Sequence, residues 1–241
     1  MRLGGYLLVL QALAFACGES VAVAAEKPSP PAHRRARARA ERLGLGTRVA
    51  ASALLRGEPE ARWVGASGGA KDRLPGTLRW PVTKGWFVRG FGSGEGGRHL
   101  AVDIAGETGW NVRAAADGIV GYADDGVKGY GNLVMIVHSG GLVTLYGHSS
   151  KLKVAAGQLV ARGDVIAEVG STGISRGPHV HFEVLYRGEL CDPLPLLRPG
   201  VRHRDGHMTP LPRAIWRRPD RRPAAVECRA RHSANDEPES P

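Results

Sequence analysis

The chain has 241 residues, enough for one domain of ordinary size with flanking segments, and its length gives no reason to expect two large domains. The 34 glycines and 16 prolines, with 6% aromatic residues, argue against a helical bundle and favour short strands joined by many turns. The formal net charge of +10 indicates attraction to polyanions, but it leaves nucleic acid, anionic lipid, wall polymers and a merely solvated surface open.

The chain begins with the pattern of a secretory signal peptide, which we place at residues 1–25. Arg2 precedes an apolar run at residues 6–16, and small residues follow that offer a cleavage site. The run is too short to span a bilayer well, so we expect export to the periplasm, cell envelope or medium and no transmembrane segment after cleavage. The alternative is a lipoprotein anchored through Cys17, although Ala14 stands where such signals usually have leucine.

Composition divides the rest of the chain into three parts. Residues 26–76 are rich in Pro, Arg and Ala and lack a sustained apolar stripe, which predicts a flexible linker or pro-region with at most one helix. Residues 77–197 are short β-branched runs between Gly-rich turns, which predicts a mainly β domain. Residues 198–241 are Arg- and Pro-rich and predict a disordered basic tail. Whether Cys191 and Cys228 pair stays open, because an oxidising compartment permits a disulfide without requiring one.

Three strand-like segments of this domain carry polar residues at alternate positions. Because side chains alternate across a strand, each segment is predicted to put these residues on one face and its apolar residues toward a core. The polar positions are His99 and Asp103 in the first segment, Thr144, Tyr146 and His148 in the second, and His179, His181 and Glu183 in the third. If the three faces line one groove, four imidazoles and the carboxylate of Asp103 gather there.

Such a group of side chains, without a cysteine, suits a catalytic zinc ion better than a structural one. Structural sites usually close four ligands around the ion, often thiolates, whereas catalytic sites use three protein ligands and keep a position for water. Zinc lowers the pKa of that water to about 7 and polarises a scissile carbonyl. The two remaining imidazoles could move the water proton and stabilise the oxyanion. Spacing alone leaves open which of His179 and His181 binds metal, and each histidine taken singly could be a surface or core residue.

The segments RHLAVDI, GYGNLVMIVH, LVTLYGHSS and GSTGISRGPHVHFEV occur in this order. Together with AAADGIV and VAAGQLVARGDVIAEVGSTG, they make residues 80–197 resemble the lysostaphin-type (LytM-like) zinc endopeptidases, which cleave the peptides of bacterial peptidoglycan. The resemblance implies antiparallel β-sheets with a substrate groove across the larger one, the duplicated hybrid motif of that fold. It also implies one Zn²⁺ per chain, and we expect a monomer.

The resemblance assigns roles to individual residues. By it, the zinc ligands are His99, Asp103 and His181, and the catalytic pair that activates water and steadies the oxyanion is His148 and His179. The chain departs from the family at Ala101, where glycine is common and whose methyl is expected to point at the site, and at Ser149, where leucine is common. Tyr130 and Asn132 are expected to border the substrate. Glu183 is either a hydrogen-bond partner of a ligand imidazole or a solvated carboxylate.

We therefore expect an exported zinc endopeptidase acting on the cross-links or stem peptides of peptidoglycan, and the sequence does not say which bond is cut. The main alternative is a non-catalytic wall-binding scaffold or an activator of cell-wall amidases, because regulatory relatives keep the fold and lose metal ligands. A non-haem iron oxygenase also uses two histidines and a carboxylate, but the export signal disfavours it. Nucleic-acid binding is not expected, because the basic segments lack interleaved aromatic residues. The basic tail and linker are expected to favour anionic envelope polymers.

Overall fold

The computed structural model describes residues 30–68, 73–209 and 214–230. The predicted signal peptide at residues 1–25 and the alternative lipid anchor at Cys17 lie outside the described residues. Among the helices within these ranges, none is long and apolar enough to cross a membrane.

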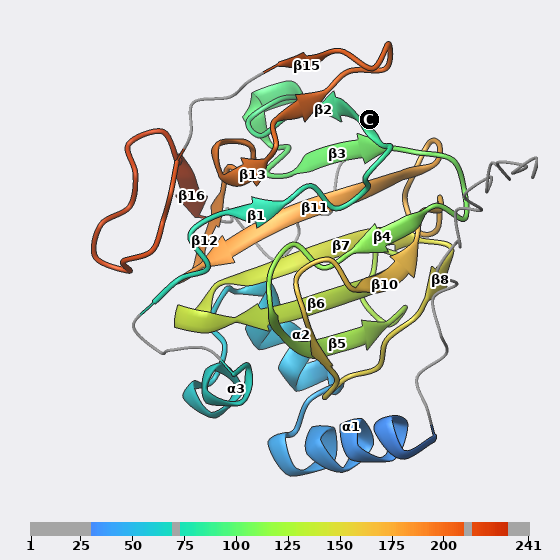
Figure 1. Ribbon diagram of the computed structural model, residues 1–241, viewed down its shortest axis with the longest axis vertical. Coiled ribbons are helices and arrows are strands. Elements are labelled where there is room, and N and C mark those ends of the chain that lie inside the picture. The colour runs from blue at the N-terminus through green and yellow to red at the C-terminus, as the bar shows by residue number, and fades with distance from the viewer. Residues whose placement is uncertain (1–29, 69–72, 210–213, 231–241) are drawn as a thin grey trace, which may run out of the picture.

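A nine-stranded sheet forms the centre of the molecule (Figure 1). Its strands are β2 (Trp86–Arg89), β3 (Val102–Ala105), β5 (Gly118–Asp124), β6 (Asn132–His138), β7 (Val143–Ser149), β9 (Leu159–Val160), β11 (His179–Tyr186), β12 (Glu189–Cys191) and β16 (Cys228–Ala230). The order is β16-β12-β11-β7-β6-β5-β9, and β3 lies between β11 and β2. All of these neighbours pair antiparallel, so the predicted mainly β, antiparallel fold is confirmed.

Shorter elements surround the main sheet. A three-stranded sheet contains β4 (Asn111–Arg113), β10 (Val165–Glu168) and β8 (Lys151–Leu152), and two-stranded pairs join β1 (Leu78–Arg79) to β13 (Leu197–Arg198) and β14 (Val201–Arg202) to β15 (Met208–Thr209). Three 3₁₀ turns are η1 (Glu95–Gly97), η2 (Ser139–Gly141) and η3 (Leu194–Leu196). The pair β1–β13 is parallel, which makes it an exception to the antiparallel pattern.

Apolar side chains fill a core on each face of the main sheet. One core includes Ile104, Val134, Ile136, Val180, Phe182 and Val184. The other includes Leu133, Met135, Val137, Val143, Leu145 and Leu185. Neighbouring residues of β6 and β11 thus enter opposite cores, as strand alternation requires. Since both faces carry apolar side chains, both must be covered.

Three helices cover the second core, so the prediction of a flexible linker with at most one helix is wrong for the described part of residues 26–76, and a pro-region role stays a prediction. The helices are α1 (Pro30–Leu43), α2 (Arg48–Leu55) and α3 (Ala61–Ala66), and in Figure 1 they lie next to β5 and β6, away from β2 and β15. Leu54 and Trp63 are fully buried in this core. A Cβ added at Gly121 would lie 2.5 Å from Leu54 Cδ1, so the missing side chain on β5 makes room for the helix.

The sequence around these helices explains where they form. Arginine and alanine dominate α1, and both favour helices. At the start of α2, Thr47 caps the helix by accepting a hydrogen bond from the Ala50 amide at 3.1 Å. The indole Nε1 of Trp63 donates to the Leu43 carbonyl at 2.8 Å and so links α3 to the end of α1. Few apolar residues anchor the helices, which is why composition alone suggested a linker.

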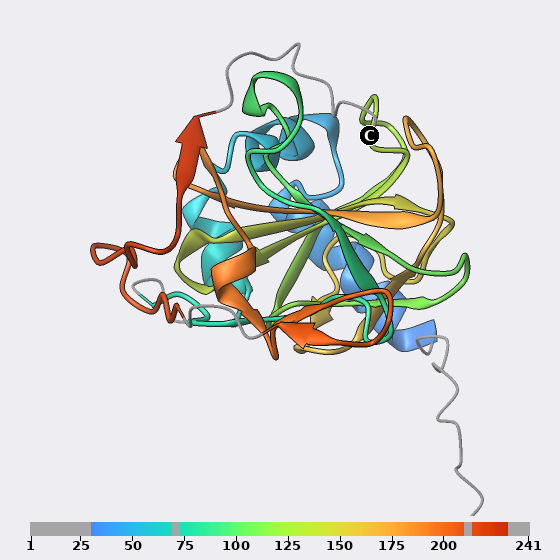
Figure 2. The same cartoon turned by 90° about the horizontal axis from the view of Figure 1, so that it is seen from above.

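Residues after the predicted domain are also ordered where the structure describes them, so the prediction of a disordered tail at residues 198–241 is wrong for 198–209 and 214–230. Trp216 is buried and packs edge-on against Tyr186, with ring centroids 4.9 Å apart. Strand β16, red in Figure 2, lies beside β12, and Cys228 forms a disulfide with Cys191. A disulfide and a buried indole give this Arg-rich segment the attachment that its average composition did not reveal. The predicted substrate groove and monomeric state stay predictions.

Candidate functional site

Two neighbouring strands and a loop bring His99, Asp103 and His181 together. In the antiparallel pair of β3 and β11, Asp103 lies directly opposite His181. His99 ends the loop before β3 and bridges to Ser93. One ligand atom from each of the three residues lies within 4.8 Å of the others, and all three side chains are buried. The three residues predicted as zinc ligands therefore converge.

The contacts of His99 show that this cluster fits a cation. His99 Nδ1 donates to the Gly90 carbonyl at 2.9 Å, so in a neutral ring the Nε2 atom is the unprotonated nitrogen, which is the form that can bind a metal ion. Nε2 lies 3.0 Å from Asp103 Oδ2, yet it has no partner with hydrogen-bond geometry. A buried nitrogen lone pair without a donor is costly unless something else occupies it. Two imidazoles and one carboxylate are the donor set of a catalytic zinc site.

His181 is held by carboxylates on both sides of its ring. Nδ1 lies 3.0 Å from Asp103 Oδ1, and Nε2 lies 3.1 Å from Glu183 Oε1, which also accepts a hydrogen bond of 2.7 Å from the Tyr130 hydroxyl. Glu183 is 4% exposed, so it is not a solvated carboxylate. Its contact with Nε2 directs the Nδ1 atom of His181 toward Asp103 and His99.

The charges in this cluster oppose the effect of burial. Burial lowers the pKa of His181, but its hydrogen bonds to Asp103 and Glu183 and their negative charges outweigh this and raise the pKa to about 9. Burial raises the pKa of Asp103, but its hydrogen bond to His181, its close contact with His99 and the charges of the two rings hold that pKa well below its ordinary range. The raised pKa favours the doubly protonated, cationic ring of His181 in the metal-free protein, and a cation bound at Nδ1 would displace the proton on that nitrogen.

His148 reaches the site through an unusual backbone conformation. In the pairing of β7 with β11, Gly147 lies opposite His181, so strand alternation would send His148 to the other face together with Tyr146. His148 instead has φ 65°, in the left-handed region that non-glycine residues rarely adopt. Its ring centroid lies 5.7 Å from that of His181 and 4.8 Å from that of His179. The left-handed backbone conformation of His148 thus turns its own side chain toward the other histidines.

The prediction that Thr144 and Tyr146 share the face of His148 is wrong for the same reason. Both side chains lie in the opposite core, where the Tyr146 hydroxyl accepts from the Ala115 amide at 2.8 Å and lies 3.0 Å from Thr144 Oγ1. Thr144 Oγ1 also lies 2.7 Å from Nε2 of the buried His138. These residues form a buried polar network of the core, away from the candidate site.

The loop between β10 and β11 orients both remaining histidines. His148 Nδ1 donates to the Thr172 carbonyl at 2.8 Å, and His179 Nδ1 donates to the Gly177 carbonyl at 2.9 Å. Both Nε2 atoms are therefore unprotonated in the neutral rings. Burial is the main cause that lowers the pKa of His148, to about 4, and burial also lowers the pKa of His179. Both rings are consequently neutral at pH 7 and able to accept a proton.

Sequence reasoning missed Thr172. Its hydroxyl donates to the Ser149 carbonyl at 2.9 Å and accepts from the Asn132 amide at 3.0 Å, while its carbonyl orients His148. A Cβ added at Gly131 would lie 2.4 Å from Thr172 Oγ1, so this glycine permits close contact between the two turns. The STG triplet in a Gly-rich loop was the available signal, but it predicts a turn and not a contact with a residue 24 positions away.

Tyr130, Asn132 and Ala101 make contacts within the protein, and the prediction that Tyr130 and Asn132 border the substrate stays a prediction. Tyr130 is 3% exposed, and its hydroxyl donates to Glu183, the carboxylate that contacts the candidate ligand His181. The Asn132 side-chain amide donates to the Ser149 carbonyl at 2.9 Å, which fastens the turn to the end of β7. Ala101 is fully buried, so its methyl does not narrow an accessible surface.

Comparison with known proteins identifies a peptidase family in the central part of the chain. Residues 97–193 match the family model described as Peptidase family M23. The murein hydrolase activator NlpD of Escherichia coli (strain K12) is 42% identical over 118 residues, which cover 49% of this chain and 30% of that protein. The DD-carboxypeptidase/endopeptidase Mpg of Neisseria meningitidis serogroup B is 45% identical over 102 residues, which cover 42% of this chain and 23% of that protein.

Among solved structures, lysostaphin from Staphylococcus simulans is 29% identical, with a TM-score of 0.49, and the match covers 57% of this chain and 59% of that one. The chain spans less than a third of the length of the two curated relatives named above. The matched segment contains every candidate ligand and both further histidines. Residues 97–193 are therefore a peptidase M23 domain of the lysostaphin type.

Proposed function

We propose that this chain is an exported zinc-dependent endopeptidase that hydrolyses peptide bonds of bacterial peptidoglycan. One observation carries the proposal: three buried donors with an unpartnered His99 Nε2 lie beside two neutral imidazoles whose Nε2 atoms are unprotonated. A non-catalytic scaffold does not require this combination. Membership of the peptidase family and the presence of an endopeptidase among the relatives support the same reaction class.

In this proposal, His99 Nε2, Asp103 and His181 Nδ1 hold one zinc ion. When bound, zinc supplies Lewis acidity to a carbonyl and makes water acidic enough to attack near neutral pH. Asp103 stays ionised, and Glu183 keeps His181 oriented through its other ring nitrogen.

His148 and His179 move protons. Either Nε2 can accept the proton of the attacking water, because each Nδ1 already donates to a backbone carbonyl. The imidazolium formed in this way becomes a donor at Nε2 and can stabilise the oxyanion or protonate the leaving amine. The fixed carbonyls of Thr172 and Gly177 keep the two rings in one tautomer through these transfers.

Two observations support export. The Cys191–Cys228 disulfide suits an oxidising compartment, because cytosolic thiols are kept reduced. Similar proteins include the "Lipoprotein NlpD/LppB homolog" of Pseudomonas aeruginosa, 43% identical over 122 residues, whose name places it at a lipid anchor. We infer that this chain also acts in the cell envelope, and that peptidoglycan is its partner there.

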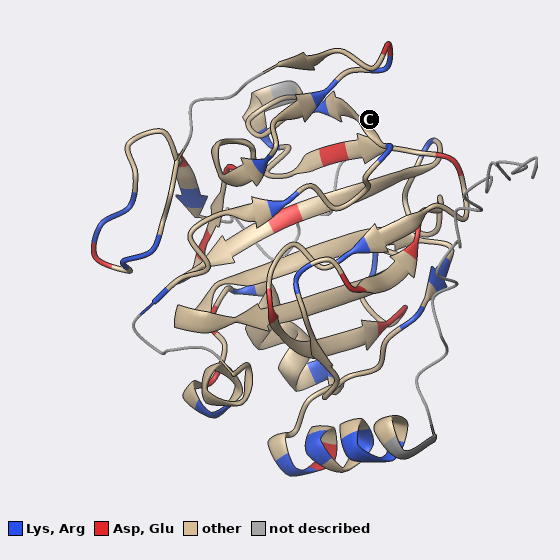
Figure 3. Cartoon of the chain, in the orientation of Figure 1, with Lys and Arg blue, Asp and Glu red and all other residues tan. Residues whose placement is uncertain are grey.

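The basic flanks are proposed to increase residence on anionic envelope polymers. Figure 3 shows Lys and Arg along α1 and on the loop before β16. Because residues 214–230 are folded and disulfide-linked, deleting the whole tail would also disturb the domain. Substitution of the exposed Arg218 and Arg221 by Gln is a cleaner test. Compared with the wild type, this variant is expected to bind cell walls more weakly at low salt and about equally at high salt. Equal binding of the two proteins at low salt would refute the idea.

An activator of cell-wall amidases is the second candidate, because the relative from Escherichia coli is named a murein hydrolase activator. The test is mass spectrometry of purified peptidoglycan incubated with zinc-loaded protein, with and without an amidase. The proposal predicts peptide fragments with new amino termini from the wild type alone and none from His148→Ala. Intact peptides with the wild type alone, together with faster amide release when the amidase is present, would establish the activator instead.

A further inference from the structure

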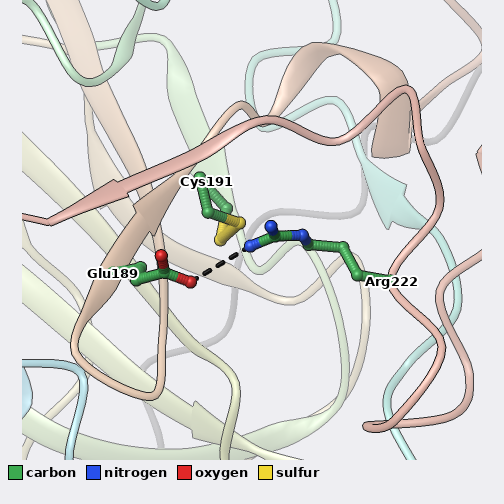
Figure 4. Close-up of a disulfide and its surroundings, with 4 residues drawn as sticks. Glu189, Cys191 and Arg222 are labelled. Atoms are coloured by element: carbon green, nitrogen blue, oxygen red, sulfur yellow. Dashed lines mark hydrogen bonds and ion pairs between the residues drawn. A yellow bond between two sulfur atoms is a disulfide. The ribbon is translucent and has the colours of Figure 1, made fainter.

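The C-terminal strand β16 is fastened to the main sheet by covalent and polar contacts. Cys228 pairs with Cys191 in the strand register, and the disulfide joins the same two residues. Figure 4 shows the Arg222 side chain reaching Glu189 beside this disulfide, with Arg222 Nη1 3.0 Å from Glu189 Oε2. Strand β16 is therefore held in one position, although it lies outside residues 97–193, the segment that matches the peptidase family.

Arg229 of this strand contacts the loop at residues 90–97. Its Nη1 donates to the Gly97 carbonyl at 3.2 Å, and its guanidinium lies 5.6 Å from the centroid of the Phe91 ring. A Cβ added at Gly97 would lie 3.0 Å from Arg229 Nη1, and one at Gly92 would lie 3.2 Å from its Nη2. The side chain thus packs against this loop.

The same loop holds His99 on two sides. The Gly90 carbonyl accepts from His99 Nδ1 at 2.9 Å, the Gly92 amide donates to the His99 carbonyl at 2.7 Å, and the His99 amide donates to the Ser93 carbonyl at 3.0 Å. Between Gly90 and His99, four glycines have positive φ: Gly92, Gly94, Gly96 and Gly97. Such a glycine-rich backbone has many accessible conformations, so a contact from outside the loop restricts it considerably.

We propose that Arg229 is a positioning residue for the metal ligand His99, and that the Cys191–Cys228 disulfide holds Arg229 in place. The path runs from the disulfide through β16 to Arg229, from Arg229 to Gly97, and through the loop to the Nδ1 contact that fixes the tautomer of His99. This inference rests on the proposed zinc site. It concerns a residue that touches neither metal nor substrate and acts through the loop.

Zinc affinity, measured by competition with a chromophoric chelator, tests the proposal without need of activity. Arg229→Gln is expected to weaken zinc binding about tenfold, as loss of a partner behind a ligand commonly does. Arg229→Lys, which keeps a donor for Gly97, is expected to recover most of the affinity. Two controls are matched: Arg222→Gln breaks another contact of the same segment, and Glu227→Gln removes the 2.6 Å ion-pair partner of Arg229 but leaves the Gly97 contact. Both are expected to bind zinc like the wild type, and equal affinity of Arg229→Gln and Arg222→Gln would overturn the proposal.

The imidazole ¹⁵N spectrum of His99 in metal-free protein gives a second readout. In the wild type we expect a single tautomer with the proton on Nδ1, and in Arg229→Gln a mixture of tautomers. The double variant Cys191→Ser/Cys228→Ser is expected to behave like Arg229→Gln in both measurements. Because the spectrum requires no zinc, a wild type that binds no zinc would refute the proposed function, whereas an unchanged tautomer in Arg229→Gln would refute the role of Arg229.

Discussion

Glu183 and His181 lie two residues apart on β11, and Glu183 Oε1 is 3.1 Å from His181 Nε2. Both side chains project from the same face of the strand because side chains alternate. Tyr130 donates to the same carboxylate oxygen, so a tyrosine, a carboxylate and an imidazole form one buried chain that ends at Asp103. The geometry of the candidate metal centre therefore depends on side chains behind the ligands as well as on the ligands.

Glu183→Gln is expected to weaken zinc binding by about 10–100-fold, because it removes the charge that makes His181 a better ligand. Chelator competition measures this directly. The matched control is Glu189→Gln. It neutralises a carboxylate whose ion-pair partner is the exposed Arg222 and not a histidine of the site. Unchanged zinc affinity in Glu183→Gln would mean that the contact with His181 does not tune the ligand.

Substitution of His148 or His179 by Ala is expected to leave zinc bound and to reduce peptidoglycan hydrolysis by about 10²–10⁴-fold, the range for loss of a proton-transfer group. The reason is that their Nε2 atoms serve the reacting groups, whereas their Nδ1 atoms are occupied by backbone carbonyls. Zinc content by mass spectrometry, together with fragment release, separates the two effects. A metal-free His179→Ala protein beside a metal-loaded His181→Ala protein would reverse the assignment.

Asp103→Ala is expected to lose zinc altogether, because Asp103 contacts both ligand histidines and supplies the only carboxylate of the three-residue cluster. Equilibrium dialysis against zinc checks this. The loss should not reflect unfolding, so the circular dichroism of the variant is compared with that of the metal-free wild type. Retention of one zinc per chain by the folded variant would contradict the ligand assignment.

His138 is expected to make folding depend on pH. It is fully buried between the Asp117 carbonyl and Thr144 Oγ1, each 2.7 Å from a ring nitrogen, and burial lowers its pKa to about 4. The unfolded chain, with an ordinary histidine pKa of about 6.5, binds the proton more readily than the folded protein. The contribution of neutral His138 to the free energy of unfolding is therefore fully present above pH 6.5 and is lost as the pH falls toward 4. The difference corresponds to about 3 kcal/mol of unfolding free energy.

Urea unfolding at pH 7 and pH 4.5 measures this effect. Other groups also titrate in this range, so the informative quantity is the change in the pH dependence. His138→Gln should reduce the loss of stability between the two pH values, while His33→Gln, at an exposed position on α1, should leave it as in the wild type. A loss as large in His138→Gln as in the wild type would show that His138 does not couple folding to pH.

Leu54→Ala tests whether the helices belong to the folded domain. Leu54 is fully buried against Gly121, so its truncation should lower the free energy of unfolding by about 2–5 kcal/mol. Val49→Ala on the same helix is the control, since Val49 is 77% exposed and should have little effect. Thermal unfolding of both variants makes the comparison, and equal midpoints would mean that α2 does not contribute to the core.

Local patterns in the sequence predicted some of this structure and missed other parts for identifiable physical reasons. Asp103 and His181 obey strand alternation, so their shared face could be foreseen, whereas alternation assumes an extended backbone and therefore fails at His148. The roles of Thr172 and Gly177 depend on carbonyls, which side-chain patterns do not reveal.

The flanking segments were misjudged because their folding depends on distant contacts. Leu54 and Trp63 are too few to form an apolar stripe, yet each fits a position in the core of the sheet. Trp216 and Cys228 lie in an Arg- and Pro-rich stretch whose average composition predicts disorder, but each is held by a partner earlier in the chain. Average composition does not record such pairings.

The most direct test of the zinc centre is an anomalous difference map, recorded at the zinc absorption edge, from crystals of the protein grown with zinc. We predict one strong peak within about 2.0–2.2 Å of His99 Nε2, an Asp103 carboxylate oxygen and His181 Nδ1, with His148 and His179 beside it but not bonded to it. A peak bonded to His179 in place of His181, or a zinc ion bound only elsewhere on the chain, would contradict the account.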